Sequence, residues 1–275
     1  MLPWSPKSWR PESRRVADEA SSRVVFGVRP VEELCRARPR EVAVVYLAEG
    51  HRSREIDLAV AAAKDRGIAV EIRPRALVAG LAGAPAHQGI VAIVGEYRYA
   101  LIADMLAAAQ AASEAPLLLL LDCITDPQNF GALVRSAEVL GAHGVVIPDK
   151  HAAPVTGSVV KASAGASERM RIARVHNLLG TIDWLGSQGV RVWGAAAERG
   201  VPLAQAELIG PTGLVVGAEG RGLREAVARR CAGVVQIPQR GQVSSLNASA
   251  AGAILLYEAM RQRGPQDDHR SPPHR

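Results

Sequence analysis

The sequence predicts an α/β protein, in which strands and helices alternate along the chain. The clearest indication is a run of five leucines that begins at Leu117 and is typical of a strand buried on both faces. Polar residues 126–129 are expected to form a loop after this strand, and a helix follows with Leu133, Val134 and Ala137 at helical spacing. Another apolar strand is predicted at 145–147. This order predicts a parallel sheet whose loop lies at the carboxyl end of a strand, where α/β proteins place their sites.

The amino-terminal part of the chain is predicted to form a small α/β domain over residues 23–96. Residues 1–22 are polar and without a sustained period, which indicates a flexible tail. The expected strands that follow are 24–27, 41–47, 68–72 and 89–94, and the expected helices are 30–36, 56–66 and 75–81. About 75 residues are enough for an independent domain.

An alanine-rich segment, 97–116, is expected to be a helical linker to a second domain, residues 117–263. A short helix rich in small residues is expected within 151–168. Strands are then predicted around 171–175, 190–195, 212–216 and 233–237. A helix is expected between the first two of these strands, and others at 224–230 and 247–261. The composition of residues 264–275 indicates a disordered tail.

The composition is that of an ordinary globular protein. The chain has 275 residues, of which 48% are hydrophobic and 22% are charged. Its apolar runs are far shorter than the roughly 20 residues of a spanning helix, and its polar start lacks the apolar core of a signal peptide. We therefore expect a cytoplasmic protein without a membrane partner. The formal charge of +6 is compatible with a polyanionic partner but does not establish one.

The three cysteines, Cys35, Cys123 and Cys231, are widely separated and include no CxxC pair. No clustered histidines accompany them. The sequence therefore predicts neither a disulfide framework nor a metal site, and we expect these cysteines to be small buried hydrophobes.

Three short segments in the second domain carry the candidate functional residues. They are NFGALVR at 129–135, GAEGRG at 217–222 and IPQRGQVSSLN at 237–247, and each was expected in a loop after a strand. Taken singly, each is explained by structure alone, since glycine-rich turns are common and Ser245 or Asn247 could simply cap a helix.

Taken together and in order, these segments closely resemble the SpoU or TrmH family of RNA ribose 2′-O-methyltransferases. Within the family, residues 24–263 are most similar to the 23S ribosomal RNA guanosine 2′-O-methyltransferases that carry a ribosomal-protein-like amino-terminal domain. The resemblance implies a SPOUT-type trefoil knot in the second domain, S-adenosylmethionine as cofactor, RNA as substrate and a homodimer that builds each active site from both chains. It also implies that residues 23–96 bind the RNA.

The resemblance implies catalytic roles for Asn129, Arg135, Glu219, Ser245 and Asn247. Main-chain atoms of Gly217, Ile237 and Leu246 are expected to contact the cofactor. Family behaviour gives the proton-acceptor role to an arginine at the position of Arg135, assisted by an RNA phosphate. An arginine normally stays protonated, so electrostatic stabilisation of the developing alkoxide is an equally good interpretation.

Two alternatives remain at this stage. The catalytic segments do not encode the target nucleotide, so an antibiotic-resistance or transfer-RNA methyltransferase of the same family would share them. A non-catalytic RNA-binding scaffold is the other, although a scaffold has no chemical need for five polar groups in three segments.

Overall fold

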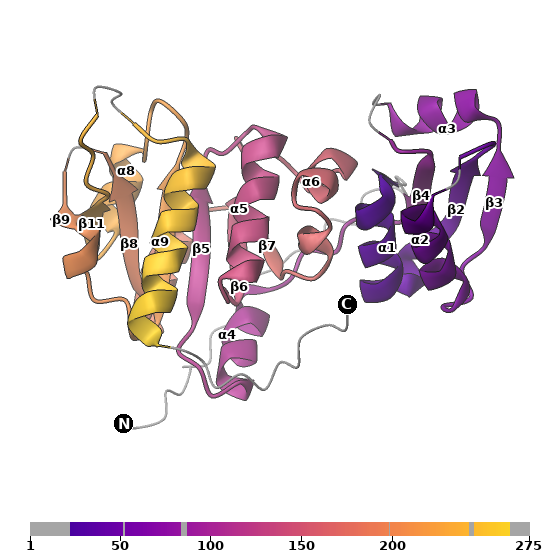
Figure 1. Cartoon of the computed structure of the whole chain (residues 1–275). Helices are drawn as coiled ribbons and strands as arrows, with labels where there is room; N and C mark the ends of the chain where they lie inside the picture. Colours follow the sequence, from indigo (N-terminus) through magenta and orange to yellow (C-terminus); the bar gives the residue numbers. More distant parts are fainter. Residues whose placement is uncertain (1–22, 52, 84–86, 198, 242–244, 265–275) are drawn as a thin grey trace. The chain divides into compact units, whose positions relative to one another are not determined.

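The computed structural model describes residues 23–51, 53–83, 87–197, 199–241 and 245–264 (Figure 1). The predicted tails therefore lie outside the described residues, apart from Gly264. The chain divides into two compact units. The amino-terminal unit comprises the described parts of residues 1–100, 125–135 and 152–172, and the carboxy-terminal unit comprises the described parts of 101–124, 136–151 and 173–275.

The amino-terminal unit contains a four-stranded sheet of order β1-β4-β2-β3. Strand β4 is antiparallel to β1 and β2, whereas β2 and β3 are parallel. The strands are β1 (Arg23–Phe26), β2 (Val42–Ala48), β3 (Val70–Arg73) and β4 (Ile90–Val94). The helices between them are α1 (Val28–Ala37), α2 (Arg54–Lys64) and α3 (Arg75–Ala82). These elements confirm the predicted alternation, with ends shifted by one or two residues.

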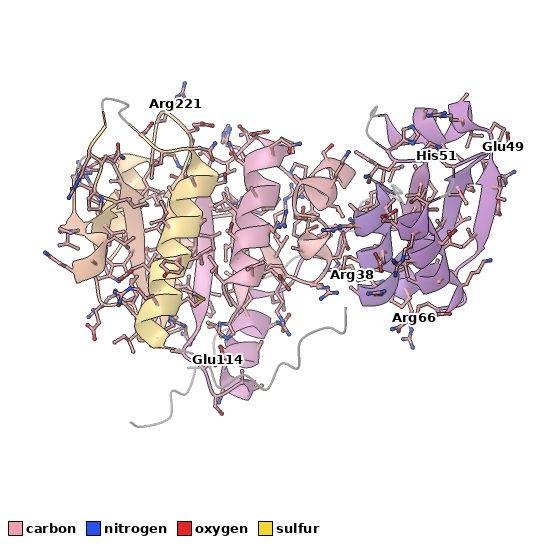
Figure 2. All side chains as sticks on the ribbon, in the orientation of Figure 1. Arg38, Glu49, His51, Arg66, Glu114 and Arg221 are labelled. Atoms are coloured by element: carbon pink, nitrogen blue, oxygen red, sulfur yellow. The ribbon has the colours of Figure 1, made fainter. Side chains whose placement is uncertain are left out.

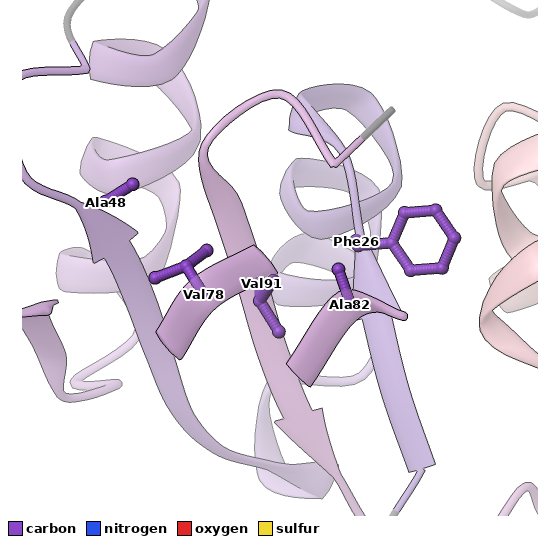
Figure 3. Close-up of a cluster of buried hydrophobic side chains, with 5 residues drawn as sticks. All are labelled: Phe26, Ala48, Val78, Ala82 and Val91. Carbon is purple, nitrogen blue, oxygen red and sulfur yellow. The ribbon is translucent and has the colours of Figure 1, made fainter. Parts of the chain in front are cut away.

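Helix α3 covers one face of this sheet through a small apolar cluster (Figure 3). Val78 and Ala82, four residues apart on α3, pack with Phe26, Ala48 and Val91 of the strands. Side chains four apart share one helix face, so the short helix needs only this stripe to dock on the sheet.

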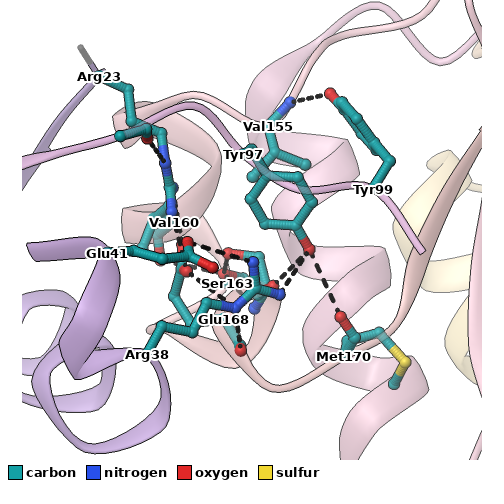
Figure 4. A network of polar contacts seen from close by, with 12 residues as sticks. Arg23, Arg38, Glu41, Tyr97, Tyr99, Val155, Val160, Ser163, Glu168 and Met170 are labelled. Carbon is teal, nitrogen blue, oxygen red and sulfur yellow. Dashed lines mark hydrogen bonds and ion pairs between the residues drawn. The ribbon is translucent and has the colours of Figure 1, made fainter. Parts of the chain in front are cut away.

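A buried ionic network joins this sheet to the segment 152–172 of the same unit (Figure 4). The Arg23 guanidinium donates to both carboxylate oxygens of Glu168, at 2.8 and 3.0 Å, and Arg38 Nε donates to the Glu168 carbonyl at 2.9 Å. Tyr97 Oη donates to the Ser167 carbonyl at 2.9 Å. Burial raises the pKa of Tyr97 well above its usual range, so the phenol stays a neutral donor. The network satisfies a carboxylate that has no exposed surface.

The carboxy-terminal unit is built on a seven-stranded sheet of order β7-β6-β5-β10-β8-β11-β9. Neighbours from β6 to β9 pair in parallel, which confirms the predicted parallel sheet. Its strands are β5 (Leu117–Asp122), β6 (Gly144–Pro148), β7 (Ile172–Val175), β8 (Arg191–Ala196), β9 (Val201–Pro202), β10 (Thr212–Gly217) and β11 (Gly233–Gln236). The two-residue edge strand β9 was not predicted. Strand β10 lies between β5 and β8, although it follows both in the sequence.

The helices of this unit are α4 (Ile102–Ala111), α7 (Leu178–Ser187), α8 (Glu225–Arg230) and α9 (Ala248–Arg263), while α6 (Gly157–Ala162) belongs to the amino-terminal unit. The end of α9 is fastened by Arg263, whose guanidinium donates to the carbonyls of Ala115, Pro116, Leu208 and Gly210. Its burial lowers the pKa of Arg263 to about 10. Among the described helices, none is long and apolar enough to span a bilayer.

Helix α5 (Pro127–Val139) corrects one sequence prediction. The polar residues after β5 were expected to form a loop, but the helix begins at Pro127, so Asn129 lies in its first turn and Arg135 in its middle. The Asp126 carboxylate accepts from the backbone N–H of Gln128 at 3.1 Å and of Asn129 at 3.3 Å. Asp126 is thus the N-cap and Pro127 the first helical residue, a pair that favours helix initiation.

Candidate active site

A cavity of about 590 Å³ lies in the carboxy-terminal unit, at the carboxyl ends of β8, β10 and β11 and beside the start of α9. This size suits a small-molecule cofactor. Five residues singled out from the sequence line it: Gly217, Glu219, Ile237, Ser245 and Leu246. Alanines 195–197, Val216, Ala248 and Ala251 supply much of the apolar wall. The second and third segments therefore meet at this cavity.

Gly217 ends β10 at the floor of this cavity, where only glycine fits. A Cβ at this position would overlap the backbone of Gly222 and Leu223. The chain from 218 to 222 folds back over Gly217, and the Gly222 N–H donates to the Ala218 carbonyl at 2.8 Å. Gly220 and Gly222 have φ of 75° and 65°, a region that favours glycine. The glycine positions in GxEGxG therefore allow a tight turn that places the backbone at the cavity.

Asp122 anchors the far end of this fold-back, a role that the sequence reasoning missed. Its fully buried carboxylate accepts from the Arg224 backbone N–H at 3.0 Å and from Arg224 Nε at 2.7 Å. The bond to Asp122 raises the pKa of Arg224 above its usual value. A signal was present in the sequence, because a carboxylate that directly ends a buried leucine strand needs a partner. The partner itself, 102 residues away, had no such signal.

Asn247 joins the third segment to the second. Its side-chain oxygen accepts from the backbone N–H of Ser249 at 2.8 Å and of Ala250 at 3.4 Å, which makes Asn247, and not Ser245, the N-cap of α9. Its amide nitrogen donates to Glu219 Oε1 at 3.2 Å. The amide offers both an acceptor for the helix and, on a separate atom, a donor for the carboxylate. The helix cap therefore also fixes Glu219 at the cavity.

Asn129 and Arg135 are not among the residues that line this cavity. Both lie on α5, in the part of the helix that belongs to the amino-terminal unit, and Arg135 is exposed. Six residues separate them, which is about 9 Å along a helix axis and about 120° around it. Between them, Gly131 lies so close to Ala162 of α6 that a Cβ would overlap it. The glycine of this segment therefore has a packing role.

The cysteines contribute no nucleophile. Burial raises the pKa of Cys35 to about 11 and that of Cys231 to about 12, and it also raises the pKa of Cys123. All three thiols are protonated at neutral pH, and all three are free. The chemistry of the site therefore depends on carboxylate, amide, hydroxyl and guanidinium groups.

Comparison with known proteins identifies the family. The SpoU rRNA methylase family matches residues 116–257, and a domain described as RNA 2′-O ribose methyltransferase substrate binding matches residues 24–100. The chain belongs to the SpoU rRNA methylase family. The resemblance stated from the sequence is thereby confirmed, as is the order of a small substrate-binding domain followed by the methylase domain.

Individual members of the family resemble the chain over different lengths. An uncharacterized tRNA/rRNA methyltransferase of Synechocystis is 44% identical over 65% of this chain. The match covers 46% of that relative, so this chain spans about half of its length. The 23S rRNA (guanosine-2′-O-)-methyltransferase RlmB of Pseudomonas syringae is 37% identical over 87% of this chain and 95% of its own length. The crystal structure of the SpoU methyltransferase AviRb of Streptomyces viridochromogenes in complex with AdoMet superposes with a TM-score of 0.72, at 27% identity, over 88% of this chain and 90% of that one.

This member of the SpoU family is thus an S-adenosylmethionine-dependent RNA 2′-O-methyltransferase, as the resemblance in the sequence predicted. The cavity fits such a cofactor. Apolar residues such as Val216, Leu246 and Ala251 suit an adenine ring, and the close backbone at Gly217 leaves main-chain groups available for its polar edges. The Glu219 carboxylate is the negative charge that a sulfonium cation would favour.

Proposed function

We propose that this enzyme methylates the ribose 2′-oxygen of a guanosine in 23S ribosomal RNA. The observation that carries the proposal is the cavity lined by Gly217, Glu219, Ile237, Ser245 and Leu246, in a chain of the SpoU family. The choice of substrate is supported by relatives named RlmB, which align over nearly their whole length. Other relatives carry the broader name tRNA/rRNA methyltransferase, which includes ribosomal RNA among the substrates. The AdoMet complex of a family member argues against a non-catalytic scaffold.

The cofactor supplies an electrophilic methyl group, and the residues of the chain supply placement and charge. The main chain at Gly217, Ile237 and Leu246 holds the cofactor, and Ser245 and Asn247 position the cofactor and the ribose. Glu219, fixed by its bond to Asn247, orders the site. Correct alignment of two reactants can itself lower a barrier by several kcal/mol, roughly 7–11 in the best cases. Alignment is therefore the main task of this rigid site.

Arg135 and Asn129 act on the reacting hydroxyl. As the methyl carbon–oxygen bond forms and the carbon–sulfur bond breaks, the 2′-hydroxyl must lose its proton and develops negative charge. The Arg135 guanidinium stabilises that charge while water or an RNA phosphate takes the proton. Alternatively, Arg135 first loses a proton to solvent with help from an RNA phosphate, and the neutral guanidine then accepts the proton of the hydroxyl. Because the cavity lining in the carboxy-terminal unit includes neither residue, a homodimer in which each site draws on both chains is a natural arrangement.

A second observation supports the homodimer. Helix α9 exposes Ile254 (37%), Tyr257 (54%) and Met260 (37%) at spacings of three residues, which is an apolar stripe that a partner would cover. The knot implied by the family is supported by β10, which lies between β5 and β8, with both of its neighbours earlier in the chain. An RNA substrate of this kind also fits a cytoplasmic enzyme. Light scattering at micromolar concentration should give the mass of a dimer, and a fully active monomer would contradict this arrangement.

The test of the function is methyl transfer from labelled S-adenosylmethionine to 23S ribosomal RNA that lacks the modification, followed by nucleoside mass analysis. We expect 2′-O-methylguanosine at one position. Only base methylation, or none on any RNA tested, would overturn the proposal.

The role of Arg135 is tested separately. Arg135→Ala should slow methyl transfer by roughly 10²-fold or more, as for other positioned catalytic groups, with the affinity for S-adenosylhomocysteine unchanged. Arg135→Lys is the matched control, because it keeps the charge. Partial activity with an unchanged pH profile favours electrostatic stabilisation, whereas a profile shifted to lower pH favours proton acceptance, since lysine loses its proton more readily. Loss of cofactor binding in proportion to activity would contradict both roles.

A further inference from the structure

The amino-terminal unit contains another cavity, of about 540 Å³, whose lining includes no residue of the three segments singled out from the sequence. It lies where α1 and α2 begin and where α6 ends, so three elements of one unit meet at it. Buried Val28, Pro30 and Ile56 line it, and exposed polar residues surround them. An apolar lining with a polar rim is typical of a ligand site.

The rim carries cationic groups that could hold an anion. Arg29 is exposed on α1, and Lys161 comes from α6, with its Nζ 5.5 Å from the centre of the Phe26 ring. His51 also lines the cavity. One carboxylate, Glu55, is present, and its hydrogen bond to the Ser53 side chain lowers its pKa. Glu55 thus interacts with the cap of its own helix, and the rim has more basic than acidic groups.

The segment 87–89, of which Gln88 lines the cavity, is fixed before any ligand binds. Gln88 Oε1 accepts from the Val28 backbone N–H at 3.0 Å, and His87 Nδ1 accepts from the Gly89 N–H at 3.1 Å. The His51 ring packs so closely on Gly89 that a Cβ there would overlap it. Burial lowers the pKa of His87, and the neighbouring His51, Arg75 and Lys161 lower it further, which indicates a positive local potential. A preformed site loses little affinity to ordering.

The geometry points to a binding site for one nucleotide of unpaired RNA, with its phosphate at Arg29 and Lys161 and its base on Val28, Pro30 and Ile56. A base can reach an apolar floor only when it is unstacked, which is how proteins read single-stranded RNA. This inference rests on the proposed function, because it takes the substrate to be RNA. It adds that Lys161, outside the substrate-binding domain match, takes part in reading that RNA.

Charge reversal of Lys161 tests the inference against a matched arginine elsewhere. Lys161→Glu and the milder Arg29→Gln are compared with Arg66→Glu. Arg66 is an exposed residue just beyond the far end of α2, and Figure 2 shows it at the opposite end of this domain from His51. The 11 residues of α2 span about 16 Å, so the control lies well away from the cavity. Affinity for an unpaired 23S RNA fragment is measured by fluorescence anisotropy over a salt series.

We expect both cavity variants to weaken RNA binding about tenfold and to reduce the salt slope by about one, while Arg66→Glu changes neither. The KM for RNA should rise with kcat and cofactor affinity unchanged. If the wild type binds the RNA fragment and both cavity variants bind it as tightly as Arg66→Glu does, this inference is wrong, while the proposed function still stands. A wild-type protein that binds cofactor but methylates no RNA would overturn the proposed function, and this inference with it. Guanosine monophosphate bound as tightly as the RNA fragment would show a site for free nucleotides and contradict the inference.

A fold control separates lost contacts from lost structure. Circular dichroism melting of each variant should match the wild type, since Arg29 is exposed and Lys161 half-buried. If Lys161→Glu melts early, Arg29→Gln alone decides. Photocrosslinking of 4-thiouridine RNA to the wild type should in addition label peptides containing residues 28–30 or 53–56, and labelling only elsewhere would overturn the site.

Discussion

Among the described residues, the carboxylates of Glu168 and Asp122 have no exposed surface, and they hold arginines in different ways. Glu168, in the amino-terminal unit, binds Arg23 and Arg38, whose side chains are only 10% and 18% exposed. Asp122, in the carboxy-terminal unit, binds Arg224, whose side chain is 51% exposed. The first ion pair is sealed from water, whereas the second has one partner in solvent.

The difference indicates two tasks. The Glu168 network joins segments 145 residues apart into one unit. Loss of Glu168 would remove the carboxylate from buried Arg23 and leave Arg38 with Glu41, at 3.7 Å, as its remaining ion pair. Asp122 instead holds the end of the fold-back that passes over the cofactor cavity. Loss of that anchor should loosen a ligand site and leave most of the core intact.

The largest effect is expected from Glu168→Ala. It should destabilise the protein by about 3–5 kcal/mol, because buried Arg23 would lose its carboxylate partner and Arg38 would keep only its longer pair with Glu41. Urea denaturation measures this. Glu207→Ala is the control, since the Arg191–Glu207 pair is largely exposed and should matter by less than about 1 kcal/mol. Equal effects of the two substitutions would show that the buried network is not special.

Gly217→Ala should act on the cofactor site. Its new Cβ would force the fold-back away from β10, and such overpacking typically costs about 1–3 kcal/mol, which corresponds to roughly a 5- to 150-fold loss of affinity for S-adenosylhomocysteine. Gly210→Ala is the matched control, because a Cβ there meets nothing within 4 Å. Calorimetric titration of both variants decides. Unchanged affinity in Gly217→Ala would remove this fold-back from the cofactor site.

Asp122→Asn should distinguish the role of Asp122 from that of Glu168. It keeps the shape but weakens the charge-assisted bonds to Arg224, for which we expect a loss of about 1–2 kcal/mol in stability, discounted because Arg224 is half exposed. Cofactor affinity should fall about tenfold. The comparison fails if Asp122→Asn destabilises the protein as much as Glu168→Ala does, since Asp122 would then be a core residue like Glu168.

The smallest effect is expected from Asn247. Asn247→Ser keeps a good helix cap, but its shorter side chain removes the amide nitrogen that reaches Glu219, so stability should change by less than about 1 kcal/mol. The rate of methyl transfer should fall about fivefold, which corresponds to about 1 kcal/mol. Asn247→Asp keeps the cap and places a second negative charge beside Glu219, so it should be slower than Asn247→Ser. If the two variants are equally active, the bond to Glu219 is not used in catalysis.

Much of this architecture was predictable because its causes are local. Hydrophobic periodicity gave the helices and strands in order, and the run from Leu117 to Leu121 indicated a central strand. The start of α5 was missed only because the caps were not weighed, since Asp126 followed by Pro127 is a helix-start signal. The grouping of Gly217, Ile237 and Leu246 at one cavity also follows from the rule that parallel strands end at the same edge.

Tertiary structure alone decided the rest. The insertion of β10 between β5 and β8, the partner of Asp122, and the bond from Asn247 to Glu219 join residues 21 to 102 positions apart. No periodicity or spacing specifies such pairs. Lys161 reached the cavity at α1 in the same way. The sequence determined which groups were available and on which elements they lie. Which groups meet was decided by packing, because a buried carboxylate or amide takes whichever partner the close-packed fold brings within hydrogen-bonding distance.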